Sequence, residues 1–69
     1  MTPEELQHIV NTGFAKTKKD PKEAVKEAKM TRQELWRIRK GKGSVRRYNQ
    51  ITRLFKFLEI PANDLSDGN

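Results

Sequence analysis

Residues 20–41 read DPKEAVKEAKMTRQELWRIRKG, and this stretch decides which fold the sequence predicts. It opens on an aspartate–proline pair, a frequent helix start because aspartate caps the first turn and proline suits the first helical position. A second start follows at Thr31, since Glu34 stands three residues later as in a capping box. Gly41 ends this second helix, because glycine takes the left-handed conformation without strain. The stretch therefore predicts two short helices, the second over residues 31–40.

The connection between these two helices is very short. Only Lys29 and Met30 separate them, so we expect the helices to cross steeply in a helix-turn-helix. The small side chains of Ala24 and Ala28 allow the close approach that this geometry needs. Met30 is expected to fill the turn from the core side, and Lys29 to take a left-handed backbone conformation. The inward face of the second helix then consists of Leu35 and Ile38.

Two more helices flank this pair. Residues 2–5 form another capping box, and the helix behind them is expected to end near residues 15–18. A fourth helix starts after residues 44–47 and stops before Pro61. Apolar residues at helical spacing mark the inward faces of these helices, namely Leu6, Ile9, Val10 and Phe14 in the first and Tyr48, Ile51, Leu54, Phe55 and Leu58 in the fourth.

The fold class that follows is all-α. Residues 61–65 are expected to add one short helical turn, and residues 66–69 to fray. No stretch shows the alternation of β-branched residues that is typical of a strand. We therefore expect one domain over residues 1–65, a compact bundle of four to five helices that contains the helix-turn-helix.

The composition excludes several classes of protein. The chain has 69 residues, of which 33% are hydrophobic and 35% charged, and it is too short for a two-domain enzyme. It has no cysteine for a disulfide or a thiolate metal site, and a single histidine, His8, makes neither a metal site nor a catalytic triad. No apolar run approaches the roughly 18 residues that span a membrane, and the N-terminus lacks a signal-peptide pattern. We therefore expect a cytoplasmic, non-enzymatic protein with no metal, cofactor or evident small-molecule ligand.

The positive charge is concentrated in one window. The formal net charge is +6, and residues 29–47 hold eight basic side chains against Glu34 alone. A polyanion is the natural partner of such a patch. The charges extend over a helix, a glycine turn and the next helix start, which favours nucleic acid over an acidic membrane, because membrane-surface helices carry them along one face. Double-stranded DNA is therefore the expected partner.

Three stretches carry a resemblance to a known family. Residues 21–30 look like its scaffold helix and turn, and residues 34–42 like the end of its recognition helix. Residues 51–65 look like its fourth helix and the apolar turn that follows. The family is the Cro/Xre-type helix-turn-helix domain of phage and bacterial repressors. The resemblance implies a lambda-repressor-like fold in which the helix over residues 31–40 enters the DNA major groove.

Four residues depart from the pattern of this family. Val25 stands where the family usually has alanine, and Lys29 where its turn favours glycine. Arg39 stands where an acidic residue is common, and Glu59 replaces a glycine after the fourth helix. These departures concern the helix angle, the loops and one salt bridge rather than the fold class.

The outward face of the helix over residues 31–40 supplies the candidate base contacts. Arg32 suits guanine because its fork matches two acceptors, and Gln33 suits adenine because its amide both donates and accepts. Trp36 and Arg37 complete this set. Two interpretations of Trp36 remain open, since its indole either contacts DNA or packs over the fourth helix.

Side chains around this helix are candidates for phosphate contacts, which position a protein without reading sequence. Gly43 lies among them and is expected to let the backbone approach the DNA. Thr31 is included, although capping its own helix is the favoured use of its hydroxyl. The candidates are Lys22, Thr31, Lys40, Lys42, Ser44, Arg46 and Arg47.

The sequence thus predicts a small phage or bacterial transcriptional repressor or regulator that binds double-stranded DNA sequence-specifically. A homodimer on a symmetric operator is expected, because one module buries little DNA surface. Phe57, Ile60 and Leu65 are candidates either for the dimer contact or for the core. The alternative function is a protein-interaction module of the same fold, such as an antitoxin or an antirepressor.

Overall fold

The structure, a computed structural model, describes residues 1–61, and every regular element in that range is an α-helix. The four helices are α1 (Pro3–Thr17), α2 (Pro21–Ala28), α3 (Arg32–Arg39) and α4 (Tyr48–Phe57). The all-helical class and the four main helices predicted from the sequence are confirmed. The predicted turn over residues 61–65 and the predicted fraying of residues 66–69 fall, apart from Pro61, outside the described residues.

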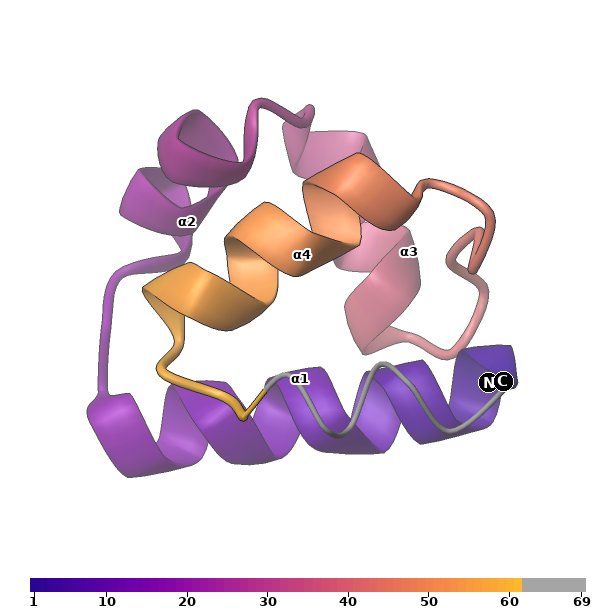
Figure 1. The fold of residues 1–69 in the computed structure, drawn as a ribbon, viewed down its shortest axis with the longest axis horizontal. Coiled ribbons are helices and arrows are strands. Elements are labelled where there is room, and N and C mark those ends of the chain that lie inside the picture. Colours follow the sequence, from indigo (N-terminus) through magenta and orange to yellow (C-terminus); the bar gives the residue numbers. More distant parts are fainter. Residues whose placement is uncertain (62–69) are drawn as a thin grey trace.

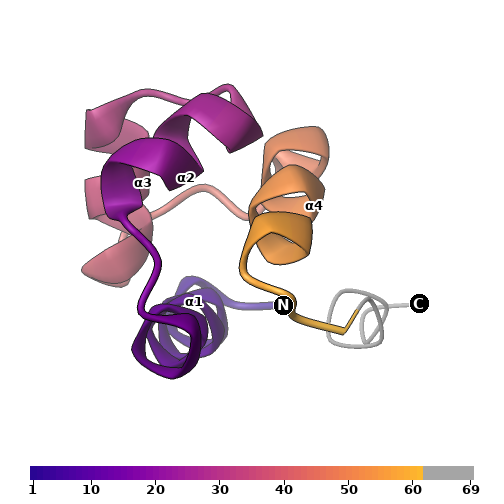
Figure 2. The same cartoon turned by 90° about the vertical axis from the view of Figure 1, so that its left-hand side faces the viewer.

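The helices pack in two main pairs. α1 runs along one side of the molecule, below α3 and α4 (Figure 1). Figure 2 shows α2 and α3 together on one side of this arrangement and α4 on the other. α1 packs chiefly against α3, and α2 chiefly against α4. Within residues 1–61, no helix is long and apolar enough to cross a membrane.

The starts of α1 and α2 have local causes in the sequence. Thr2 and Glu5 form a complete capping box, with both backbone-to-side-chain distances at 3.1 Å. Asp20 caps α2 by accepting a hydrogen bond from the Lys22 N–H at 2.9 Å. The starts of α1 and α2 therefore match the sequence patterns that predicted them.

Three helices end on a left-handed residue that is not glycine. Lys18 and Lys29 follow α1 and α2 with φ angles of 56° and 55°, and Glu59 follows α4 closely with φ 58°. Only the turn after α3 uses glycine, with Gly41 at φ 82°. The left-handed conformations expected at Lys29 and Gly41 are confirmed. A side chain makes this conformation strained, so the domain stores backbone strain at three helix ends.

Replacing Lys29 with glycine is expected to stabilise the domain by about 1 kcal/mol, because glycine removes the strain of the left-handed residue. Thermal and urea unfolding followed by circular dichroism measure this change. Lys26→Gly is the matched control, since it places glycine inside α2, where it should destabilise by about 1 kcal/mol. If Lys29→Gly is instead destabilised, the contacts of the Lys29 side chain stabilise the domain by more than its left-handed backbone conformation destabilises it.

The core lies where the helices meet, and its centre is fully apolar. Leu35 and Ile38 point inward from α3 with 4% of their surface exposed, as predicted. Gly13 on α1 lies against the chain after α4, because a Cβ there would come within 2.9 Å of Ile60 Cδ1. The Ile60 side chain therefore packs against α1 and the core of its own domain. The buried hydrophobic residues are Leu6, Val10, Phe14, Ala24, Ala28, Met30, Leu35, Ile38, Ile51, Leu54, Phe55 and Leu58.

The C-terminal end of α4 is held by a lysine from the loop that follows α1. Lys19 Nζ donates a hydrogen bond to the carbonyl of Phe57 at 2.6 Å and lies 4.8 Å from the centre of the Phe57 ring. The same ammonium is 3.5 Å from Glu59 Oε2. A cation at this position stabilises the negative end of the helix dipole. Phe57 is therefore partly covered by its own chain.

The prediction that Tyr48 lies in the core is wrong. Tyr48 is the first residue of α4 and is 59% exposed. The buried face of α4 begins one turn later, at Ile51, so no neighbouring helix covers the tyrosine ring. Helical spacing alone extended the apolar stripe one turn too far.

Candidate nucleic-acid interface

The face of α3 opposite the core is exposed along its whole length. Leu35 and Ile38 hold the helix from beneath. Gln33 and Arg37 are four residues apart, and Arg37 and Lys40 are three apart. This helical spacing places all three side chains on one stripe of the opposite face. The four candidate base contacts Arg32, Gln33, Trp36 and Arg37 are all exposed.

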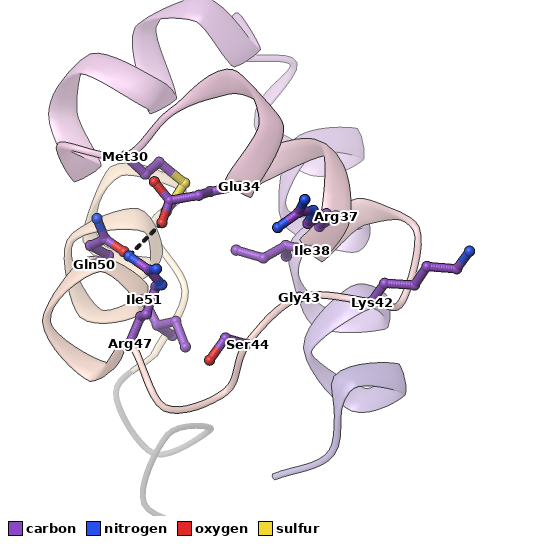
Figure 3. Close-up of a pocket in the computed structure, with 10 residues that line it drawn as sticks. All are labelled: Met30, Glu34, Arg37, Ile38, Lys42, Gly43, Ser44, Arg47, Gln50 and Ile51. Atoms are coloured by element: carbon purple, nitrogen blue, oxygen red, sulfur yellow. Dashed lines mark ion pairs between the residues drawn. The ribbon is translucent and has the colours of Figure 1, made fainter.

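A pocket of about 190 Å³ borders α3 on the side of α4. It brings together one sequence-predicted residue of α3 with three from the loop that leads to α4, namely Arg37 with Lys42, Ser44 and Arg47. Figure 3 shows Arg47 reaching across this pocket toward Glu34, while Lys42 extends away from it. We call this hollow the α3–α4 pocket.

A groove borders α3 on its other flank, toward α2. The apolar side chains of Val25, Leu35 and Trp36 line it together with the cations Lys22 and Arg32. Trp36 is 58% exposed there, so it does not complete a core against α4. The predicted residues therefore lie along both flanks of α3 as well as on its outer face.

Three candidate phosphate contacts also have local roles. The Thr31 hydroxyl accepts a hydrogen bond from the Glu34 N–H at 3.1 Å, which is the capping role favoured for it. Ser44 Oγ accepts a hydrogen bond from the Arg46 N–H at 3.2 Å and orders the loop before α4. The Lys22 N–H is used by Asp20, so that only the exposed side chain of Lys22 is available to a ligand.

Arg39 is half-buried at the border of the groove toward α2, and its side chain reaches toward α1. Its Nε donates a hydrogen bond to Asn11 Oδ1 at 2.8 Å, and its guanidinium lies 4.7 Å from the centre of the Phe14 ring. Its carbonyl accepts hydrogen bonds from Gln7 and Asn11 on α1. Arg39 therefore links α3 to α1 through its side chain and its carbonyl.

Gly43 is needed for packing against α3, a role that the sequence analysis did not assign to it. It is buried, and a Cβ at this position would lie 2.5 Å from Ile38 Cγ1 and 2.7 Å from the backbone Cα of Ile38. The loop can therefore cross the end of α3 only without a side chain at residue 43.

Sequence reasoning missed an ion pair between the start of α3 and the start of α4. Arg47 Nη1 lies 2.8 Å from Glu34 Oε2, and Arg47 is the N-cap residue of α4. The other carboxylate oxygen, Oε1, accepts a hydrogen bond from the Thr31 N–H at 3.0 Å. Residues 34 and 47 are far apart in the sequence, and helical periodicity carries no signal for their contact.

These contacts lower the pKa of the Glu34 carboxyl below its ordinary value. The hydrogen bond from the Thr31 N–H is the main cause, and partial burial opposes it. The Thr31 hydroxyl and the charges of Arg47 and Arg37 lower the pKa further. Glu34 is therefore ionised at neutral pH within an otherwise cationic surface.

The lowered pKa of Glu34 makes part of the stability depend on pH. A carboxylate whose pKa is lower in the folded state stabilises at neutral pH, and this contribution disappears as the pH falls through the folded pKa. We expect Glu34→Gln to lower the melting temperature at pH 7, and this gap to shrink as the pH falls below about 4.3, the ordinary pKa of a glutamate. Thermal unfolding across this pH range measures the gap, and a gap that stays constant would contradict the assigned contacts.

Comparisons with protein-family models, curated proteins and solved structures find no match to this chain. Among residues 1–61, no three histidine or acidic side chains are grouped so that they could hold a metal ion. The interpretation of the exposed α3 face therefore rests on its own geometry and charge.

Proposed function

We propose that this protein binds double-stranded DNA as a helix-turn-helix regulator of the Cro/Xre type, with α3 in the major groove. The observation that carries the proposal is the exposed outer face of α3, anchored by Leu35 and Ile38 and bordered by cations on both flanks. Gln33 and Arg37 lie on that face, and Arg32 lies at its edge. Side chains of these types match the base edges exposed in the major groove.

The short connection between α2 and α3 supports the same proposal. Lys29 breaks the helical path with a left-handed backbone, and Met30 is buried at the turn. α2 is fixed to α4, which leaves the outer face of α3 uncovered by the other described helices. The resemblance of residues 21–65 to phage and bacterial repressors points to a repressor that works as a dimer on a symmetric operator.

Binding to a random-sequence DNA duplex tests the proposal through its salt dependence. If about six phosphates are neutralised, log K should fall against log salt with a slope near −5. Arg47→Ala is expected to weaken binding to every duplex alike and to make this slope shallower by about 1. Fluorescence anisotropy over a salt series measures both quantities.

Lys16→Ala is the matched control for Arg47→Ala. Lys16 is an exposed cation on α1, away from the α3 face, so its loss should change the slope little. A wild-type protein that binds no duplex even at low salt would overturn the proposed function. A change of sequence preference in Arg47→Ala would instead mean that α3 is rotated relative to the proposal.

One observation favours the alternative of a protein-interaction module. Trp36 is 58% exposed beside the apolar groove that includes Val25. Exposed aromatic residues are enriched in protein–protein interfaces. Absence of DNA binding together with loss of partner binding in Trp36→Ala would favour an antitoxin or antirepressor role.

A further inference from the structure

The basic window over residues 29–47 contains a single acidic residue, Glu34, and its position is unexpected. Glu34 lies in the first turn of α3, in the middle of the basic window. A negative charge at a DNA interface repels phosphate, so electrostatics alone predict that its removal strengthens binding. The contacts of Glu34 suggest the opposite effect.

Both oxygens of the Glu34 carboxylate are engaged, in two different directions. Oε1 accepts a hydrogen bond from the Thr31 N–H at 3.0 Å, which fixes the carboxylate to the start of α3. Oε2 lies 2.8 Å from Arg47 Nη1, across the α3–α4 pocket (Figure 3). The Glu34 side chain is 21% exposed, whereas the Arg47 side chain is 60% exposed. Glu34 thus forms a mostly covered anchor for an accessible guanidinium.

The ion pair leaves the guanidinium able to bind a second anion. Oε2 has no aligned hydrogen bond from any described group, so the pair is held by charge. Arginine carries five N–H donors on a rigid fork, and only one nitrogen of Arg47 lies against the carboxylate. Arg47 is itself the N-cap residue of α4, so the ion pair links the start of α4 to α3.

We propose that Glu34 is a positioning residue for Arg47, which holds the guanidinium ready for a DNA phosphate while the same carboxylate caps α3. The inference rests on the proposed function. Fixing a flexible arginine before binding lowers the entropy lost when the phosphate is bound. The benefit of this positioning then exceeds the repulsion between Glu34 and the DNA.

The test compares the affinities of the wild type and of two variants, Glu34→Gln and Glu27→Gln, for one DNA duplex. Glu34→Gln keeps the capping box, because glutamine also serves at that position, but it removes the charge that holds Arg47. We expect its affinity to fall about two- to tenfold, which corresponds to losing one pre-ordered side chain. Glu27→Gln removes the same charge from an exposed site on α2 and should raise affinity slightly.

Two further measurements separate positioning from general damage. In an Arg47→Ala background, Glu34→Gln should cause no further loss of affinity. Glu34→Asp keeps the net charge but is too short to reach both partners, so it should weaken binding as Glu34→Gln does. This variant decides the question if Glu34→Gln fails to fold.

The possible failures are distinguishable. If the wild type binds no duplex, the proposed function fails and this inference fails with it. If the wild type binds and Glu34→Gln binds equally well or more tightly, only the positioning role of Glu34 is wrong. An equal loss in the presence and absence of Arg47 would also overturn it, because Glu34 would then act without that arginine.

Discussion

The variant Leu35→Ala is expected to be largely unfolded at room temperature. Leu35 joins α3 to the core and is 4% exposed. Removing a buried leucine side chain costs about 2–5 kcal/mol, which is a large share of the stability of so small a domain. Far-ultraviolet circular dichroism and one-dimensional NMR would show lost helical signal and collapsed amide dispersion.

The neighbouring residue provides the control for this prediction. Trp36 follows Leu35 on α3 but is 58% exposed, so Trp36→Ala should change stability by less than about 1 kcal/mol. A folded Leu35→Ala variant beside an unfolded Trp36→Ala variant would show that α3 presents its other face to the core. The proposed interface would then be wrong as well.

The second large effect is expected at the first turn of α3. The double variant Arg32→Ala with Gln33→Ala should lose most of its preference for a selected operator over random DNA. A good bidentate pairing discriminates by about 1–3 kcal/mol, so each base that is no longer read should reduce the preference roughly 5- to 150-fold. Operators selected from random DNA by the wild type supply the sequence against which both proteins are titrated.

The double variant should lower the ratio of its affinities for the operator and for random DNA much more than its affinity for random DNA. Arg32 also carries one charge, so binding to random DNA should weaken only modestly. Lys42→Ala, which removes an equal charge from the loop after α3, is expected to keep the preference of the wild type. Unchanged discrimination in the double variant would remove Arg32 and Gln33 from the reading surface.

The helices and their limits are predictable because their causes are local. Capping residues, prolines and glycines act within a few positions of one another, as at Thr31 with Glu34 and at Gly41. The same local periodicity identifies Leu35 and Ile38 as the inward face of α3, and thus the residues that point outward.

Long-range contacts are not predictable from the sequence. Arg39 reaches Asn11 and Lys19 reaches Phe57, across separations that helical periodicity does not encode. The packing of Gly43 against Ile38 is likewise not visible in the sequence, because it depends on the path of a loop. Such contacts matter for the site, since they change which side chains are free to bind a ligand.

The Glu34–Arg47 pair illustrates the same limit at the candidate interface. The sequence identifies Arg47 as a phosphate contact and Glu34 as a capping residue, each from its own neighbourhood. Their ion pair depends on how the loop after Gly41 returns α4 to the start of α3. The sequence suggests a role for each residue separately, and the structure adds the contact between them.

Mapping a DNA duplex onto the protein by amide NMR shifts tests the central claim most directly, namely that α3 and its flanks bind DNA. We predict that the largest shifts at moderate salt fall between Thr31 and Arg47, with smaller ones near Lys22 at the start of α2. We also expect the exposed residues of α1 such as Lys16 to be unaffected. Shifts concentrated on α1 or on the later turns of α4, with α3 unchanged, would contradict this claim.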